Sequence, residues 1–251
     1  MGRVNLIEIQ TPDGAAEAYL TGSGPGVLFF IDGIGLRPQI GEMADRIAGW
    51  GYTVLAPNVF HREGSTAALA PRGDLRDREE RERFLSTGPF ERVRRYTPEL
   101  SGPDTVAWVD ALAEHAGPGR IGTTGYCMGA RLAVRAAGLL PESVAAVGGW
   151  HGGGLVTDAP DSPHRGIAAT TAAYAFGHAD HDRSMPADAV VALGEVLERA
   201  GCPYVNEVYA GAAHGYTMAD TPAYDEAAAE RHFRALRRLL DANLPERRGL
   251  A

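Results

Sequence analysis

Short runs of almost entirely apolar residues recur along this chain, and they restrict the possible folds more than any other feature. The runs lie at residues 27–31, 52–56, 144–150 and 170–176, and each is followed by proline, glycine or a polar residue. A run without alternating polar positions is typical of a parallel strand buried on both faces. Helix-like segments separate the runs, so the pattern predicts strand–helix–strand units with right-handed crossovers. We therefore expect an α/β fold with a mostly parallel central sheet flanked by helices on both faces.

The length of the chain suits one such sheet. With 251 residues, 45% of them apolar, the chain can bury the core of one large domain, and we predict a single domain over residues 1–251. Segment 61–101 differs from the rest, because residues 72–95 are dense in Arg, Asp and Glu and hold few core-forming side chains. We predict a charged, cap-like insert within the domain. The charge run favours a helix in water over a cap that covers a site.

The overall charge and composition narrow the classes of function. A formal net charge of −8 argues against a nucleic-acid partner. The two cysteines, Cys127 and Cys202, indicate no disulfide framework, and no apolar run approaches the roughly 20 residues that span a bilayer. Strand-like sequence follows the first three residues directly, so we expect no signal peptide and no membrane partner. We expect a cytoplasmic enzyme that is a monomer or a small homo-oligomer.

The stretch Gly-Thr-Thr-Gly-Tyr-Cys-Met-Gly-Ala at 122–130 contains the pattern Gly-x-nucleophile-x-Gly. Cys127 occupies the position where serine usually stands, and a helix-like segment follows it. The glycines keep side chains out of a crowded strand-to-helix turn, so the sulfur is presented at its tip. The N–H groups at the start of the helix favour negative charge there, as a thiolate or an oxyanion. The alternative is a buried structural cysteine, and this pattern alone does not decide between the two.

Five chemically active side chains directly follow predicted strands, namely Asp32, Cys127, His151, Asp180 and His214. In parallel sheets, ligands bind beyond the carboxyl ends of the strands, so this shared placement favours one common site. The chain order of a nucleophile, an acid and a histidine is also the order found in α/β-hydrolases.

Each member of a Cys127–Asp180–His214 triad has a physical task. A free thiol has a pKa of about 8.5, so a base must take its proton near neutral pH. His214 can do so because imidazole titrates near neutrality, and Asp180 would orient the ring and stabilise its charged form. The backbone N–H groups of Gly33 and Met128 are placed to form an oxyanion hole.

Several alternatives compete with these assignments. Asp182 is the rival of Asp180 as the carboxylate that orients the histidine, and we prefer Asp180 because it lies closer to the strand end. His178 and His181 lie beside Asp180 and could belong to a metal site, but no third ligand stands at a useful spacing. We expect no metal and no organic cofactor. Cys202, between glycine and proline after a helix, is expected to pack rather than react.

At these residues the chain resembles the dienelactone hydrolase family, and the resemblance extends from residue 27 to about residue 240. The stretches that carry it are Phe-Ile-Asp-Gly-Ile-Gly at 30–35, Ala-Pro-Asn-Val-Phe at 56–60, Gly-Tyr-Cys-Met-Gly at 125–129, Ala-Phe-Gly-His-Ala-Asp at 175–180 and Gly-Ala-Ala-His at 211–214. The resemblance implies an α/β-hydrolase fold and the cleavage of an ester or lactone through an acyl-cysteine intermediate. It places the triad of the family on Cys127, Asp180 and His214.

The resemblance also identifies binding residues and two departures. A carboxylate that readies the thiol, usually Glu in the family, falls on the shorter Asp32. Family members hold a substrate carboxylate with two arginines, but residues 215–218 contain none. In the charged segment Arg76, Arg78, Arg81 and Arg83 are available, and we select Arg81. One lost arginine could cost tenfold or more in binding a dicarboxylate-like lactone.

We further select Tyr126 and His151 as substrate-binding residues. Together these observations predict a carboxylic ester or lactone hydrolase with a small-molecule substrate. A metal-dependent hydrolase, a non-catalytic ligand-binding protein of the same fold and a transacylase are the alternatives.

Overall fold

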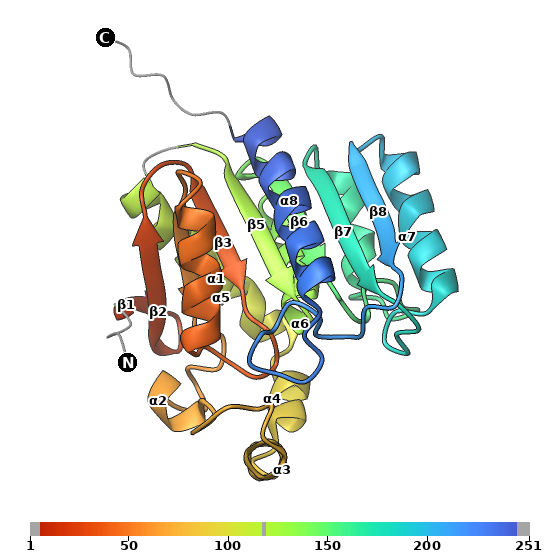
Figure 1. Cartoon of the computed structure of the whole chain (residues 1–251). Coiled ribbons are helices and arrows are strands. Elements are labelled where there is room, and N and C mark those ends of the chain that lie inside the picture. The colour runs from red at the N-terminus through yellow and green to blue at the C-terminus, as the bar shows by residue number, and fades with distance from the viewer. Residues whose placement is uncertain (1–5, 117–118, 245–251) are drawn as a thin grey trace.

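The computed structural model describes residues 6–116 and 119–244, and its centre is one eight-stranded sheet of order β1-β2-β4-β3-β5-β6-β7-β8 (Figure 1). Strands β3 to β8 run parallel to one another, whereas β2 pairs antiparallel with both β1 and β4. The strands are β1 Leu6–Thr11, β2 Gly14–Gly22, β3 Gly26–Phe30, β4 Thr53–Pro57, β5 Ile121–Tyr126, β6 Val144–Trp150, β7 Ala173–Ala179 and β8 Tyr204–Tyr209.

The apolar runs of the sequence form the interior of this sheet. Every residue of β3, β4, β5, β6 and β7 is buried, as expected for parallel strands covered on both faces. The outermost strands, β1 and β8, instead expose many of their side chains. The predicted α/β fold is therefore confirmed, and the position of each central strand follows from its apolar run.

Helices cover both faces of the sheet (Figure 1). On one face lie α1 and α8, which are joined by an ion pair between Arg46 and Glu230. On the other face α5 and α6 pack against the strands, and the 3-10 helix η1 lies between α6 and α7. The bounds are α1 Pro38–Ala48, α5 Pro98–Ala116, α6 Met128–Leu139, η1 Pro163–Ala169, α7 Ala187–Ala200 and α8 Glu226–Asn243. Within the described residues, no helix has the length and apolar character needed to cross a membrane.

Segment 61–101 contains three short helices, α2 Thr66–Leu69, α3 Arg78–Leu85 and α4 Pro89–Arg95. They lie beyond the carboxyl ends of the strands (Figure 1). Most charged side chains of α3 are exposed, but Phe84 is buried and lines a cavity that it shares with Cys127. The segment therefore combines both alternatives, because most of its charged side chains are exposed while one side of it covers a pocket.

One predicted boundary differs from the structure. We expected a strand at 170–176, but η1 occupies 163–169 and β7 runs from Ala173 to Ala179. The shift makes Asp180 the first residue after β7, which affects the site described next.

Candidate active site

Cys127 lies at a sharp turn between β5 and α6, with backbone angles of φ 54° and ψ −116°. A positive φ is strained for a residue with a side chain, and such strain is found where function requires it. The two flanking positions must be glycine because the surrounding backbone leaves no room for a Cβ atom. A Cβ at Gly125 would lie 2.0 Å from the carbonyl oxygen of Gly129, and one at Gly129 would lie 2.2 Å from that of Phe30. The predicted elbow is therefore present, and its cysteine is partly exposed.

His214 contacts a buried carboxylate and lines the same cavity as Cys127. Its Nδ1 lies 2.6 Å from Oδ2 of Asp182, whose side chain is 6% exposed. Burial disfavours the charged imidazole, but the hydrogen bonds and charges of Asp182 and Cys127 outweigh it and raise the pKa of His214 to about 10. Burial likewise opposes ionisation of Asp182, yet His214 and Ser184 lower its pKa to about 2. The three groups together favour a charged histidine.

The orienting carboxylate is Asp182, so the expectation for Asp180 is wrong. The carboxylate of Asp180 accepts the N–H of Gly211 at 2.8 Å and lies 3.7 Å from Nε2 of His181. His181 has a φ of 51°, so the chain turns sharply between the two aspartates. Asp182 is then fixed by the N–H and the hydroxyl of Ser184, at 2.8 and 2.7 Å. Proximity to the strand end was a poor guide because the turn redirects the second carboxylate.

His151 is a buried neutral neighbour of this group. Its ring centroid lies 5.3 Å from that of His214, and its Nε2 lies 2.7 Å from the hydroxyl oxygen of Thr217. Burial, followed by the charges of His214 and His232, holds its pKa well below the usual range. Nδ1 of His151 is buried and has no hydrogen-bond partner among the described residues. Since His151 lines the same cavity as Cys127, it can offer a ligand an uncharged polar contact.

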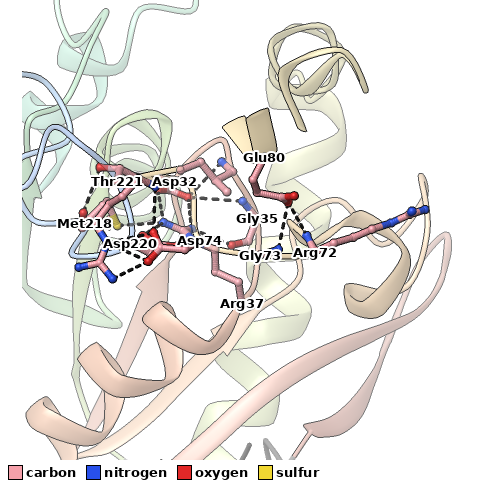
Figure 2. A network of polar contacts seen from close by, with 12 residues as sticks. Asp32, Gly35, Arg37, Arg72, Gly73, Asp74, Glu80, Met218, Asp220 and Thr221 are labelled. Carbon is pink, nitrogen blue, oxygen red and sulfur yellow. Dashed lines mark hydrogen bonds and ion pairs between the residues drawn. The ribbon is translucent and has the colours of Figure 1, made fainter. Parts of the chain in front are cut away.

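Asp32 is bound to an arginine instead of the thiol (Figure 2). Its Oδ1 accepts from Nη1 of Arg37 at 2.7 Å and from the N–H of Ile34 at 3.0 Å, and its Oδ2 accepts from Nη2 of Arg37 at 3.0 Å. Arg37 also donates from Nε to Asp220 at 2.5 Å. The expected contact between Asp32 and Cys127 is therefore replaced by a buried Asp32–Arg37–Asp220 cluster.

Arg37 and Asp220 are the residues of this region that the sequence analysis missed. Arg37 is 4% exposed, and although burial lowers the pKa of a guanidinium, Asp32 and Asp220 raise it above its ordinary value. One feature of the sequence could have identified Arg37. It is the last residue of the loop after a predicted strand and stands directly before Pro38, so its side chain lies near the end of that strand.

The candidate oxyanion donors belong to two neighbouring segments. Met128 is the first residue of α6, and Gly33 lies in the loop after β3 and lines the cavity. A Cβ at Gly33 would lie 2.8 Å from Cγ2 of Val93 in α4, so a side chain there would meet the insert. Among the described residues, neither backbone N–H has a partner in the loop and cap hydrogen bonds. The two N–H groups therefore remain candidates for an oxyanion hole.

The cavity beside Cys127 has a volume of about 330 Å³. Arg81 lines it, as expected for a substrate contact, and its Nη1 donates to the carbonyl oxygens of Leu75 and Arg76 at 2.9 and 3.3 Å. Tyr126 does not line it, so the expectation of substrate contact there is wrong. Its ring is fully buried, stacks on Phe29 at 4.7 Å, and its hydroxyl lies 3.2 Å from Nε2 of His232.

The alternative metal site is not assembled. Nε2 of His178 lies 2.7 Å from Oδ1 of Asn206, whereas the side chain of His181 is 96% exposed. In the described ranges, no three His, Cys, Asp or Glu side chains are grouped so that they could hold a metal ion. Cys202 is buried, with its sulfur 3.7 Å from the carbonyl oxygen of Thr170.

Comparisons with known proteins identify the family and the fold. Residues 14–244 match the model of the dienelactone hydrolase family. A Salmonella typhi protein named "Putative carboxymethylenebutenolidase" is 28% identical over 247 residues, covering 88% of this chain and 86% of that protein. A "Putative Dienelactone Hydrolase" from Klebsiella pneumoniae has a crystal structure that matches with a TM-score of 0.77 at 20% identity, covering 94% of this chain and 96% of that chain. The dienelactone hydrolase structure from Anabaena variabilis matches with a TM-score of 0.64 at 19% identity, covering 95% and 97%. These structures confirm the α/β-hydrolase fold.

Proposed function

Because the chain belongs to the dienelactone hydrolase family, we propose that it hydrolyses a small ester or lactone through Cys127, His214 and Asp182. One observation carries the proposal. The ring of His214 contacts the carboxylate of Asp182 and lines the same cavity as Cys127, although the three residues come from separate loops. A nucleophile, a base and a group that orients the base are the parts that acyl transfer requires.

The first half of the reaction forms an acyl-cysteine. His214 holds the proton of Cys127, and the thiolate attacks the carbonyl carbon of the ester. The negative charge that develops on the carbonyl oxygen is bound by the N–H groups of Gly33 and Met128. The protonated His214 then donates its proton to the leaving alcohol oxygen, and the C–O bond breaks. Asp182 stabilises the imidazolium throughout, which agrees with the raised pKa of His214.

The second half releases the acid. His214, now neutral, takes a proton from water, and the resulting hydroxide attacks the thioester carbon. The tetrahedral intermediate uses the same two N–H groups, and its collapse returns the thiolate and the protonated histidine. No step needs a metal or an organic cofactor, because thiolate, imidazole and backbone N–H groups supply all the charges and protons.

The decisive test replaces the nucleophile. Cys127→Ala should abolish hydrolysis of p-nitrophenyl butyrate, measured by release of p-nitrophenol, because no acyl-enzyme can form. Cys202→Ala is the matched control, since Cys202 is buried away from the cavity, and it should retain activity close to that of the wild-type protein. Mass spectrometry of rapidly quenched wild-type protein should show the added butyryl mass on Cys127. Wild-type activity in Cys127→Ala would refute the proposed nucleophile.

A further inference from the structure

We infer that the preferred substrate presents an uncharged, apolar acyl group to this cavity, and this inference rests on the proposed ester or lactone hydrolysis. The first observation is the apolar character of the cavity wall. Its side chains come mostly from the insert and from the loops after β3 and β8, and most are apolar, including Ile34, Leu75, Phe84, Leu85, Phe90 and Met218. An acyl chain gains affinity from such a wall, whereas a carboxylate placed there loses its hydration.

The buried cation near the cavity is already neutralised. Arg37 donates to the carboxylates of Asp32 and Asp220, and its Nη1 also donates to the carbonyl oxygen of Gly35 at 3.0 Å. Two carboxylates and one guanidinium leave the cluster with one net negative charge. An anionic substrate beside Asp32 would therefore meet repulsion instead of a charge-assisted hydrogen bond.

Met218 is an apolar side chain of the cavity wall that also contacts the Arg37 guanidinium. It lies four residues after His214, lines the cavity and is 1% exposed. Its sulfur accepts from Nη2 of Arg37 at 3.3 Å, so it separates the guanidinium from the cavity. A soft, flexible thioether adapts to hydrocarbon and offers nothing to an anion.

Arg81 is the remaining guanidinium of the wall. Its Nη1 is bound to the main-chain carbonyls of Leu75 and Arg76, so this group positions the loop that leads into α3. We assign Arg81 a positioning role for the apolar residue Leu75, which also lines the cavity.

The mouth of the cavity extends the apolar surface outward. Phe90 is 65% exposed and Leu85 is 43% exposed, although both are large apolar side chains of the lining. An acyl chain that leaves the cavity can cover them, and each methylene that becomes buried is worth about a three- to fourfold gain in kcat/KM. The geometry points to acyl groups longer than acetyl.

The test compares two esters that differ at one end of the acyl group. We expect kcat/KM for p-nitrophenyl butyrate to exceed that for mono-p-nitrophenyl succinate by about tenfold or more, because only the second carries a carboxylate. In the series acetate, butyrate and hexanoate, kcat/KM should rise with each step. Equal or better turnover of the succinate ester would overturn the inference. If no ester shows Cys127-dependent turnover, the proposed function itself fails, so the two failures are distinguishable.

Single substitutions test separately what Phe90 and Arg81 contribute to the choice of acyl group. Phe90→Ala should lower kcat/KM for the hexanoate more than for the acetate. Val191→Ala is the matched control, because Val191 is 61% exposed on α7 and does not line the cavity, and it should change neither. Arg81→Gln should affect butyrate and succinate esters by the same factor. A loss confined to the succinate ester would show that Arg81 binds carboxylate and would contradict the assignment.

Discussion

Two buried carboxylates lie at the same edge of the sheet as Cys127, and each pairs with a different kind of basic side chain. The side chain of Asp182 is 6% exposed and contacts His214, whereas that of Asp32 is 5% exposed and contacts Arg37. Both follow parallel strands and both accept several hydrogen bonds. Histidine can gain and lose a proton near neutral pH, but arginine stays charged. The partner therefore decides whether a carboxylate at this edge can support proton transfer or can only hold loops together.

The two pairs also join different parts of the chain. Asp182 and His214 connect the loops after β7 and β8, and thereby fix the proposed base in the cavity that Cys127 also lines. Arg37 connects the loop after β3, which carries Gly33, with Asp220 in the segment that follows His214. The first connection orients a reacting group, and the second sets the shape of the cavity around it.

The largest effect is expected when the proposed catalytic pair of Asp182 and His214 is broken. Asp182→Asn should lower kcat for p-nitrophenyl butyrate by about 10⁴-fold, the size found when the aspartate of a serine triad is replaced by asparagine. The amide would favour the wrong tautomer of His214 and would no longer stabilise the imidazolium. Steady-state kinetics at neutral pH measure the loss.

Asp180→Asn is the matched control for that prediction, because Asp180 lies two residues away and contacts the N–H of Gly211 instead of His214. It should keep kcat within about threefold of the wild-type value, as expected for a surface substitution with little effect on the free energy. A loss in Asp180→Asn as large as in Asp182→Asn would contradict the geometry.

A smaller effect, on stability, should follow from breaking the structural pair. Arg37→Met leaves Asp32 buried without its counter-ion and should lower the free energy of unfolding by about 3–5 kcal/mol. Urea denaturation followed by circular dichroism measures it. Asp182→Asn should cost much less in the same experiment, because His214 is more exposed than Arg37. Equal stability losses in the two variants would show that the two carboxylates are not specialised.

The smallest effect is a dependence of stability on pH. The folded protein keeps a proton on His214 up to about pH 10, whereas an unfolded histidine loses it near its ordinary pKa of 6.5. Asp182 stays ionised down to about pH 2, against an ordinary pKa of 3.8. The stabilisation by this pair is therefore complete between those ordinary values, and it declines as the pH rises toward 10 or falls toward 2.

Thermal unfolding at several pH values measures this dependence. The difference in Tm between the wild-type protein and Asp182→Asn should be largest near pH 5 and should shrink by pH 10. The same comparison for Arg37→Met should change little from pH 5 to pH 10, because Arg37 does not titrate there. A difference for Asp182→Asn that grows with pH would contradict the charged His214–Asp182 pair.

Much of the fold is predictable from the sequence because a strand that is buried on both faces requires a continuous run of apolar residues. The run at residues 27–31 and strand β3 differ by one residue at each end, and the run at 144–150 coincides with β6. The elbow is equally visible, since the space around Gly125 and Gly129 excludes a Cβ. In these places local sequence and tertiary structure impose the same requirement.

The carboxylates were harder to predict because their partners are distant in the chain. The choice between Asp180 and Asp182 depends on a backbone turn at His181, where a positive φ is not signalled by glycine. The partner of Asp32 depends on how loops far apart in sequence meet, since Arg37 and Asp220 are separated by 183 positions. The sequence therefore shows which polar side chains lie at the strand ends, whereas the structure is needed to show which of them contact one another.

The contact between Gly33 and Val93 has a consequence for the diversity of such enzymes. A methyl group added at position 33 would lie 2.8 Å from a methyl group of Val93. The insert therefore packs closely against the loop that carries a proposed oxyanion donor. Transplanting another insert onto this scaffold, or lengthening α4, must preserve that clearance. The charged insert and the loop with the proposed oxyanion donor therefore cannot be redesigned independently at this point of contact.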